Sequence, residues 1–235
     1  MNSIFERKQT EQDESHWLSV SDLMAGLMMV FLFIAIALMQ SAFKERDKIK
    51  EVAVAYQENQ VAIYDALMLE FNDDLKRWNA DIDEETLTFT FKAPEVLFSE
   101  GSSELSLAYK MLLDEFFPRY MEVLMPFKAS INEVRIEGHT SSDWKGLTKD
   151  QAYFENMRLS QERTRTVLNY VYKLDTTKSY ASWLKSHFSA VGLSSSKLLY
   201  NQDGTENKSK SRRVSLRVLT NADIQIKQIL QGGAT

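Results

Sequence analysis

The hydrophobic positions of this chain change their spacing twice between its two ends. Residues 23–39 form a continuous apolar run that contains only Gly26 and a few alanines besides large hydrophobic side chains. With its tolerant flanks, the run approaches the roughly 20 residues that a helix needs to cross a hydrocarbon core of about 30 Å. We therefore predict a single transmembrane helix over residues 17–43, preceded by a polar tail over residues 1–16 that lacks periodicity.

A cleaved signal peptide is the alternative to this membrane span. The residues ahead of the run include Glu6, Glu11, Asp13 and Glu14, whereas the first region of a signal peptide is basic. The apolar run is also longer than the core of a signal peptide. The sequence therefore favours a helix that stays in the membrane.

Beyond the span, the apolar positions recur every three, four or seven residues, which is the spacing of one helical face. These positions are Ile49, Val52, Tyr56, Ile63, Leu67, Phe71, Leu75 and Trp78. Such a seam has to be buried against another chain or against the domain that follows. We predict a helical linker over residues 44–80 that forms a dimer; the alternative is that this helix is the first helix of the next domain.

After Asn79 the pattern changes to short alternating stretches separated by helical ones, which predicts an α/β (α+β) domain over residues 81–222. A C-terminal tail over residues 223–235 follows. Strands are expected at 87–91, 134–138, 188–191 and 214–219, and helices at 104–124 and 149–174. The polar stretch 194–213 is typical of a loop before the last strand.

Composition and charge exclude several classes of function. The net charge is −5, with 33 acidic and 28 basic residues, so no overall positive field draws the chain to nucleic acid. The basic stretch 208–213 is typical of a solvated loop. Cysteine is absent, and His16, His139 and His187 show neither a Ser-His-Asp pattern nor a metal-ligand cluster. We expect no enzymatic activity, no metal, no cofactor and no nucleic-acid partner, and a core position for His139.

One carboxyl group, that of Asp22, lies at the start of the apolar run. An ionised aspartate deep in hydrocarbon costs about 2.5–3.5 kcal/mol on insertion scales, so its presence requires an explanation. The simplest explanation is that Asp22, with Ser19 and Ser21, caps the helix at the membrane surface. The functional alternative is that the carboxyl binds and releases an ion as its surroundings alternate.

Residues 17–33, WLSVSDLMAGLMMVFLF, resemble the transmembrane signature of MotB-type stator subunits. In that family one aspartate opens the span, and Leu-Met pairs and a phenylalanine-rich run follow it. The resemblance implies that Asp22 binds the transported ion, H⁺ or Na⁺. Gly26 permits close packing with a neighbouring helix, and the large side chains after it are expected to pack against partner chains.

Three motifs in the second half of the chain resemble, in order and rough spacing, those of OmpA-like peptidoglycan-binding domains. They are VLFSEGSSEL at 96–105, IEGHT at 136–140 with NMRLSQER at 156–163, and RRV at 212–214. The resemblance covers residues 85–220, with an extra stretch near 179–186. It implies a βαβ sandwich that binds the bacterial cell wall.

The residue types suit this ligand, because the peptide stem of the wall carries carboxylates and an ammonium. Arg163 can hold a carboxylate through a two-pronged hydrogen bond, and Asn156 offers both a donor and an acceptor. Leu159 shares their helical face. The alternative for Arg163 is a surface ion pair with an acidic neighbour such as Glu162.

One position departs from the family pattern. The aspartate that follows Gly-His-Thr in the family, and that meets the ammonium of the ligand, is replaced here by a serine; Asp143 is the expected substitute. The resemblance thus assigns peptidoglycan binding to Asn156, Leu159, Arg163, Thr140, Ser141 and Asp143.

The glycine within SDLMAGLM and the altered wall-binding loop resemble most the ZorB family, the MotB-like subunits of Zorya anti-phage defence systems. That resemblance implies a homodimer inside a pentamer of MotA-like (ZorA-type) partners. It also implies that ion flow past Asp22 turns the pentamer while the wall holds this chain stationary. A flagellar MotB-type stator subunit and a passive tether between inner membrane and peptidoglycan are the alternatives.

The charges that flank the span conflict with wall binding. Basic residues gather on the cytoplasmic side of membrane proteins, and more of them follow this span than precede it. They are Arg7 and Lys8 before it, and Lys44, Arg46, Lys48 and Lys50 after it. Peptidoglycan lies outside the cytoplasmic membrane, so we nevertheless predict an inner-membrane protein with a cytoplasmic N-terminus and a periplasmic C-terminal domain.

Overall fold

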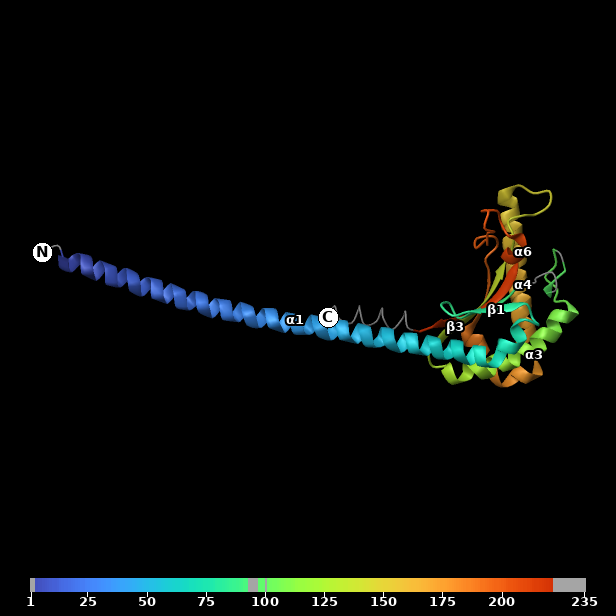
Figure 1. Cartoon of the computed structure of the whole chain (residues 1–235), viewed down its shortest axis with the longest axis horizontal. Helices are drawn as coiled ribbons and strands as arrows, with labels where there is room; N and C mark the ends of the chain where they lie inside the picture. The colour runs from blue at the N-terminus through green and yellow to red at the C-terminus, as the bar shows by residue number, and fades with distance from the viewer. Residues whose placement is uncertain (1–2, 93–96, 100, 222–235) are drawn as a thin grey trace. The chain divides into compact units, whose positions relative to one another are not determined.

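The computed structural model describes residues 3–92, 97–99 and 101–221 (Figure 1). They belong to two compact units, one with the chain up to Val52 and the other with the chain from Ala53. The C-terminal tail predicted for 223–235 lies outside the described residues.

Helix α1, Ser3–Leu75, contributes to both units. It contains no proline and only one glycine, Gly26, and these are the two residue types that most often interrupt a helix. The helix includes residues 3–16, where the sequence predicted a polar tail. A helix satisfies its own backbone hydrogen bonds and needs no apolar face to do so.

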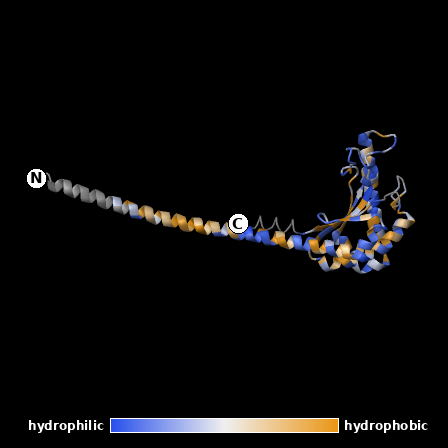
Figure 2. Cartoon of the chain, viewed as in Figure 1, coloured by the Kyte–Doolittle hydropathy of each residue, from blue (hydrophilic) through white to orange (hydrophobic). Residues whose placement is uncertain are grey.

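In the first unit, hydrophobic residues follow one another along α1 (Figure 2). Their large side chains are exposed, and Leu23, Phe33 and Leu38 are 72%, 68% and 66% exposed. An 18-residue window of this helix has a mean hydropathy of 2.4, and none of the window is buried within the chain. By length and composition, the helix fits the membrane span predicted for residues 17–43.

The second unit contains a five-stranded sheet in the order β1-β2-β5-β3-β4. The strands are β1 Ala80–Asp83, β2 Thr88–Phe91, β3 Ile131–His139, β4 Phe188–Gly192 and β5 Arg213–Thr220. Only β3 and β4 are parallel, and the other neighbours are antiparallel. All four predicted strands are present. β1 was not predicted, because in its short Ala-Asp-Ile-Asp sequence only Ile82 is buried.

Two of the remaining helices, α3 Leu107–Leu124 and α4 Lys149–Tyr172, were predicted, over 104–124 and 149–174. The shorter helices were not predicted: η1 Met125–Phe127, η2 Asp175–Tyr180, α5 Ala181–His187 and α6 Lys208–Ser211. The extra stretch near 179–186 forms the end of η2 and most of α5. The predicted loop 194–213 contains the one-turn helix α6, which is too short to show a helical period in the sequence.

The second part of α1 belongs to the core of this domain. Ile63, Leu67 and Phe71 are fully buried, and the ring of Phe71 lies 5.5 Å from that of Phe89 and 5.2 Å from that of Phe116. This part of the predicted seam is therefore covered by the chain's own domain, as the alternative interpretation of the linker required. Dimerisation through the linker stays a prediction.

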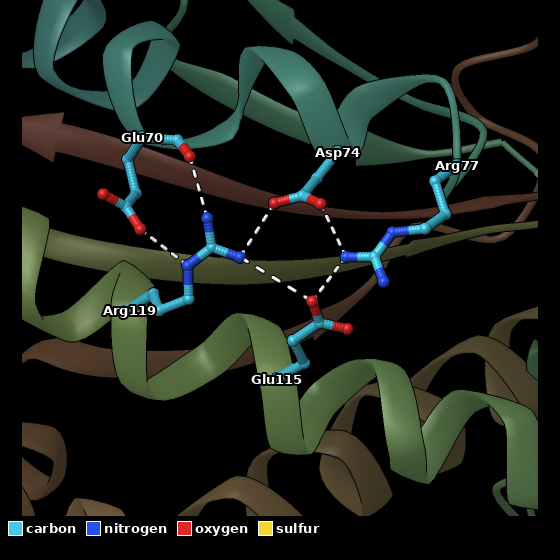
Figure 3. A network of polar contacts seen from close by, with 5 residues as sticks. All are labelled: Glu70, Asp74, Arg77, Glu115 and Arg119. Atoms are coloured by element: carbon cyan, nitrogen blue, oxygen red, sulfur yellow. Dashed lines mark hydrogen bonds and ion pairs between the residues drawn. The ribbon is translucent and has the colours of Figure 1, made fainter.

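Five charged side chains join the end of α1 to α3 (Figure 3). Arg119 donates to Glu70 (Nε–Oε1 2.6 Å) and to Asp74 (Nη1–Oδ2 2.8 Å). Arg77 donates to the other oxygen of Asp74 (Nη2–Oδ1 2.5 Å) and to Glu115. Two arginines thus share three carboxylates, so the last turns of α1 are tied to α3 by charge as well as by apolar packing.

Candidate wall-binding site

All six residues predicted to bind the wall line one cavity of the second unit. Its volume is about 560 Å³. The lining residues are Phe98, Gly101, Thr140, Ser141, Asp143, Trp144, Lys145, Asn156, Leu159, Arg163, Lys208 and Arg212. The cavity thus brings together the end of β3, one face of α4 and the residues around α6.

Two glycines allow α4 to approach the sheet at this point. Gly138 and Gly192 are paired across β3 and β4. A Cβ at Gly192 would lie 2.4 Å from the backbone nitrogen of Gln161, and one at Gly138 would lie 2.8 Å from the carbonyl oxygen of Ser160. Only glycine fits at such distances, so these positions set the depth at which α4 presents its polar side chains to the cavity.

Asn156 holds the loop after β3 in place. Its Nδ2 donates to the carbonyl oxygens of Ser141 (3.1 Å) and Asp143 (3.2 Å). The backbone nitrogen of Thr140 donates to the carbonyl of Ser194 (2.9 Å), which fixes the start of the same loop. The donors of Asn156, predicted for the ligand, are therefore used within the chain, and its oxygen remains as the group for a ligand.

Arg163 is a buried cation without a carboxylate partner in the part of the chain that the structure describes. Its side chain donates to the carbonyls of Ser102 (Nε, 2.8 Å) and Ser99 (Nη2, 3.2 Å), and its guanidinium lies 4.8 Å from the centre of the Phe98 ring. Burial, together with the charge of Arg212, lowers the pKa of Arg163 to about 10. An anionic ligand would therefore relieve an uncompensated charge.

The alternative of a surface ion pair for Arg163 is wrong. Glu155 and Glu162 instead pair with Arg158 on the exposed side of α4, at 3.0 Å each. Arg163 points the other way, into the domain, because it shares the buried face with Asn156 and Leu159.

The acidic residues near the cavity are engaged by other parts of the chain. Asp143 forms an ion pair with Lys208. Glu206 accepts hydrogen bonds from the nitrogen (3.0 Å) and the hydroxyl (2.5 Å) of Ser142. Ser141 is buried, and it offers a hydroxyl where the family has a carboxylate.

His139 occupies the buried position that the sequence predicted. Its Nε2 lies 3.5 Å from Oε2 of Glu137, whereas its Nδ1 is buried without a partner among the described residues. Burial lowers the pKa of His139, and the carboxylate of Glu137 offsets only part of that shift. The imidazole packs at the end of β3, directly before the loop residues that line the cavity.

Six lining residues lie outside the sequence-based prediction of the site: Phe98, Gly101, Trp144, Lys145, Lys208 and Arg212. Lys208 and Arg212 were assigned to a solvated loop, but α6 turns them into the cavity. Phe98 was recognised only as part of a fold motif, whereas its ring lies beneath Arg163. The signal available in the sequence was the basic stretch 208–213. A cluster of basic residues can form an anion site when the fold places it beside a cavity.

In the first unit, Asp22 lies well inside α1, and its side chain is exposed. The helix begins at Ser3, so Asp22 does not occupy a cap position. The interpretation of Asp22 as a helix cap is therefore wrong, and its place beside an exposed apolar run needs another explanation.

Comparison with known proteins places these features in families. A model of the OmpA family matches residues 97–212, which confirms the OmpA-like domain. Similar solved structures include a putative MotB-like protein from Desulfovibrio vulgaris (18% identity, 72% of this chain and 94% of that one, TM-score 0.46). The cell wall anchor of the T6SS from Pseudomonas aeruginosa is another (19% identity, 66% and 96%, TM-score 0.45).

A relative of known name extends over both units. The chain is 54% identical over 222 residues to the Zorya protein ZorB of Escherichia coli, and the match covers 94% of each chain. It includes most of α1 together with the OmpA-like domain, because only a few residues of either chain lie outside it. The chain belongs to the ZorB family of Zorya proteins.

Proposed function

We propose that this chain is the wall-anchored, ion-conducting stator subunit of an ion-driven rotary motor in Zorya-type anti-phage defence. One observation carries the proposal. The same chain joins a carboxyl inside an exposed apolar helix, Asp22, to a domain whose cavity holds an uncompensated cation, Arg163. A motor needs both, because ion flow supplies the work and an anchor resists the reaction torque.

The anchoring step rests on the cavity. Arg163 presents a guanidinium that lacks a carboxylate partner among the described residues, and Leu159 supplies an apolar wall beside it. A carboxylate of the peptide stem supplies the missing negative charge through charge-assisted hydrogen bonds. Thr140, Ser141 and Asp143 surround the same space, and the oxygen of Asn156 accepts a donor of the ligand.

The ion step rests on Asp22. A proton or sodium ion that binds this carboxyl removes its charge, and release restores it. The exposed apolar side chains after Asp22 require cover from other chains or from lipid. We assign that cover to a second copy of this chain and to a surrounding pentamer of a MotA-like (ZorA-type) partner. Each ion that crosses 100 mV supplies about 2.3 kcal/mol.

The orientation follows from the ligand. Because peptidoglycan lies outside the cytoplasmic membrane, the second unit is periplasmic and the N-terminus is cytoplasmic. A reporter fused after Thr235 tests this orientation against the opposite one that the flanking basic residues favour.

Replacement of Asp22 by asparagine tests the ion step. In cells that carry the intact operon, Asp22→Asn is expected to abolish protection from phage while the chain accumulates normally in the membrane. The matched control is Asp47→Asn, the same change at an exposed aspartate that pairs with its neighbour Arg46. Loss of swimming instead would identify a flagellar stator, and unchanged protection and swimming would leave a passive tether.

Replacement of Arg163 by lysine tests the anchoring step. Lysine keeps the charge but cannot form the two-pronged hydrogen bond, so binding of the full chain to purified cell-wall sacculi is expected to weaken about tenfold. Arg158→Lys, which alters an arginine on the exposed face of the same helix, is expected to bind as the wild type does. Equal binding by Arg163→Lys would remove this residue from the wall site.

A further inference from the structure

The charges that line the cavity are strongly unbalanced. Four of its lining residues are cations: Lys145, Arg163, Lys208 and Arg212. The one acidic residue among them, Asp143, already forms an ion pair with Lys208. Lining residues within the described chain therefore offer a ligand several positive groups and no unpaired carboxylate.

Several polar groups of the cavity lack partners. Arg163 donates hydrogen bonds only to backbone carbonyls. Nε of Arg212 is buried without a hydrogen-bond acceptor, and the hydroxyl of Thr140 is buried without any hydrogen-bond partner. These statements hold for the described residues, and Thr140 and Arg163 are each more than nine-tenths buried. Buried donors of this kind are rarely left unpaired, so they indicate a ligand that brings acceptor oxygens.

An ammonium finds no corresponding place. Ser141 carries a neutral hydroxyl at the point where the loop enters the cavity. The carboxylate of Glu206 accepts hydrogen bonds from Ser142 at both oxygens and is not among the residues that line the cavity. A cationic group that enters here meets like charges and must first displace Lys208 from Asp143.

From this imbalance we infer that the cavity prefers a stem peptide whose carboxylate is free and whose distal amine is acylated, as in a cross-link, over one with a free ammonium. Acylation converts the ammonium to a neutral amide, which removes the repulsion while the carboxylate still reaches Arg163. The inference rests on the proposed wall-binding function and narrows it. The anchor would then engage cross-linked wall in preference to uncross-linked stems.

Two soluble muropeptides test the preference. Both are disaccharide tripeptides that end in meso-diaminopimelate, and one is acetylated on its distal amine. With the full chain in detergent, we expect the acetylated ligand to have a Kd at least threefold lower by isothermal titration calorimetry. A free-amine ligand that binds as tightly or more tightly overturns the inference and leaves wall binding intact. Absence of binding by both ligands overturns the wall-binding proposal itself.

Variants of two residues separate charge from shape. Ser141→Asp adds a carboxylate beside the cavity and is expected to reverse the preference, so that the free-amine ligand binds about tenfold more tightly than it does to the wild type. Ser141→Asn has nearly the same size without the charge and should keep the wild-type preference. Lys208→Met releases Asp143 and should shift the preference in the same direction as Ser141→Asp. Unchanged preference in both charge variants would overturn the inference.

Discussion

Helix α1 carries two apolar stretches that end in opposite environments. Large side chains such as Leu23 and Phe33 are 72% and 68% exposed in the first stretch, whereas Ile63, Leu67 and Phe71 are fully buried in the second. Both stretches are parts of one uninterrupted helix. Hydrophobicity alone therefore does not decide which of them enters the protein core.

The spacing of the apolar residues separates the two stretches. In the first, they follow one another around the helix, so no single neighbouring face can cover them, and a membrane or several partner chains can. In the second, they recur at intervals of four and share one face, which matches the single face of the sheet and α3 beneath it. The spacing of the apolar residues thus indicates whether each stretch is covered by the chain's own domain or by a membrane or partner chains.

Replacement of Phe71 by alanine is the largest test of this contrast. Phe71 is fully buried and packs near the rings of Phe89 and Phe116, so Phe71→Ala is expected to lower the free energy of unfolding by about 3–5 kcal/mol. Urea unfolding of the full chain in detergent, followed by tryptophan fluorescence, measures the change.

Two control variants test whether this effect is specific to the buried face of the second stretch. Leu69→Ala changes a side chain on the same part of α1 that is 90% exposed, and it should alter the free energy by less than about 0.5 kcal/mol. Phe33→Ala, in the first stretch, should leave the unfolding of the domain unchanged. A large effect of Phe33→Ala would show that the first stretch also packs on the domain.

Much of this fold is predictable from local pattern. Four strands and both long helices of the domain follow from the alternation and the 3.6-residue period, because each period reports one buried face. β1 could not be predicted in this way, because it has a single buried residue, Ile82, and one residue defines no spacing. The helical conformation of residues 3–16 was also not predicted, because a polar segment without an apolar face resembles a tail.

The site was only partly predictable. Resemblance to a family found the six residues near β3 and α4, whereas Lys208 and Arg212 reach the cavity only through the return of a long loop. Charge pairing was equally hidden. Lys208 neutralises Asp143, and the amide of Asn156 donates to the loop after β3. Both contacts join residues far apart in the chain, so the sequence alone does not reveal them.

Added bulk at glycine gives a smaller test of the contrast. Gly192→Ala places a Cβ 2.4 Å from the nitrogen of Gln161, and the resulting shift of α4 is expected to cost about 1–3 kcal/mol of domain stability and to weaken wall binding. Gly26→Ala, in the first stretch, meets nothing within 4 Å in this chain. It should leave domain stability unchanged.

Protection from phage in cells that carry the intact operon supplies the complementary measurement. If Gly26 packs closely against a partner helix, Gly26→Ala lowers protection from phage although the isolated chain unfolds normally. Normal protection by this variant would show that no neighbouring helix approaches Gly26 closely. The two glycines therefore distinguish packing inside the chain from packing between chains.

The smallest expected effect concerns the charged contacts that hold the second stretch of α1. Burial raises the pKa of Asp74, but the hydrogen bonds and charges of Arg119 and Arg77 outweigh it, so the pKa lies below the ordinary 3.8. Because the folded-state pKa is depressed, the stabilisation is present above pH 3.8 and is lost as the pH falls through the folded-state value.

Asp74→Asn should therefore cost about 1 kcal/mol or less at pH 7 and should flatten the decline in stability below pH 3.8. Asp65→Asn, at an exposed aspartate on the same helix, is the control and should keep the wild-type decline. Urea midpoints measured from pH 7 to pH 3 compare the two variants. If Asp74→Asn declines as steeply as the wild type, the contacts of Asp74 shown in Figure 3 contribute nothing to the attachment of α1. That attachment then rests on the apolar packing of Phe71 and its neighbours and on the remaining ion pairs of Arg119 and Arg77.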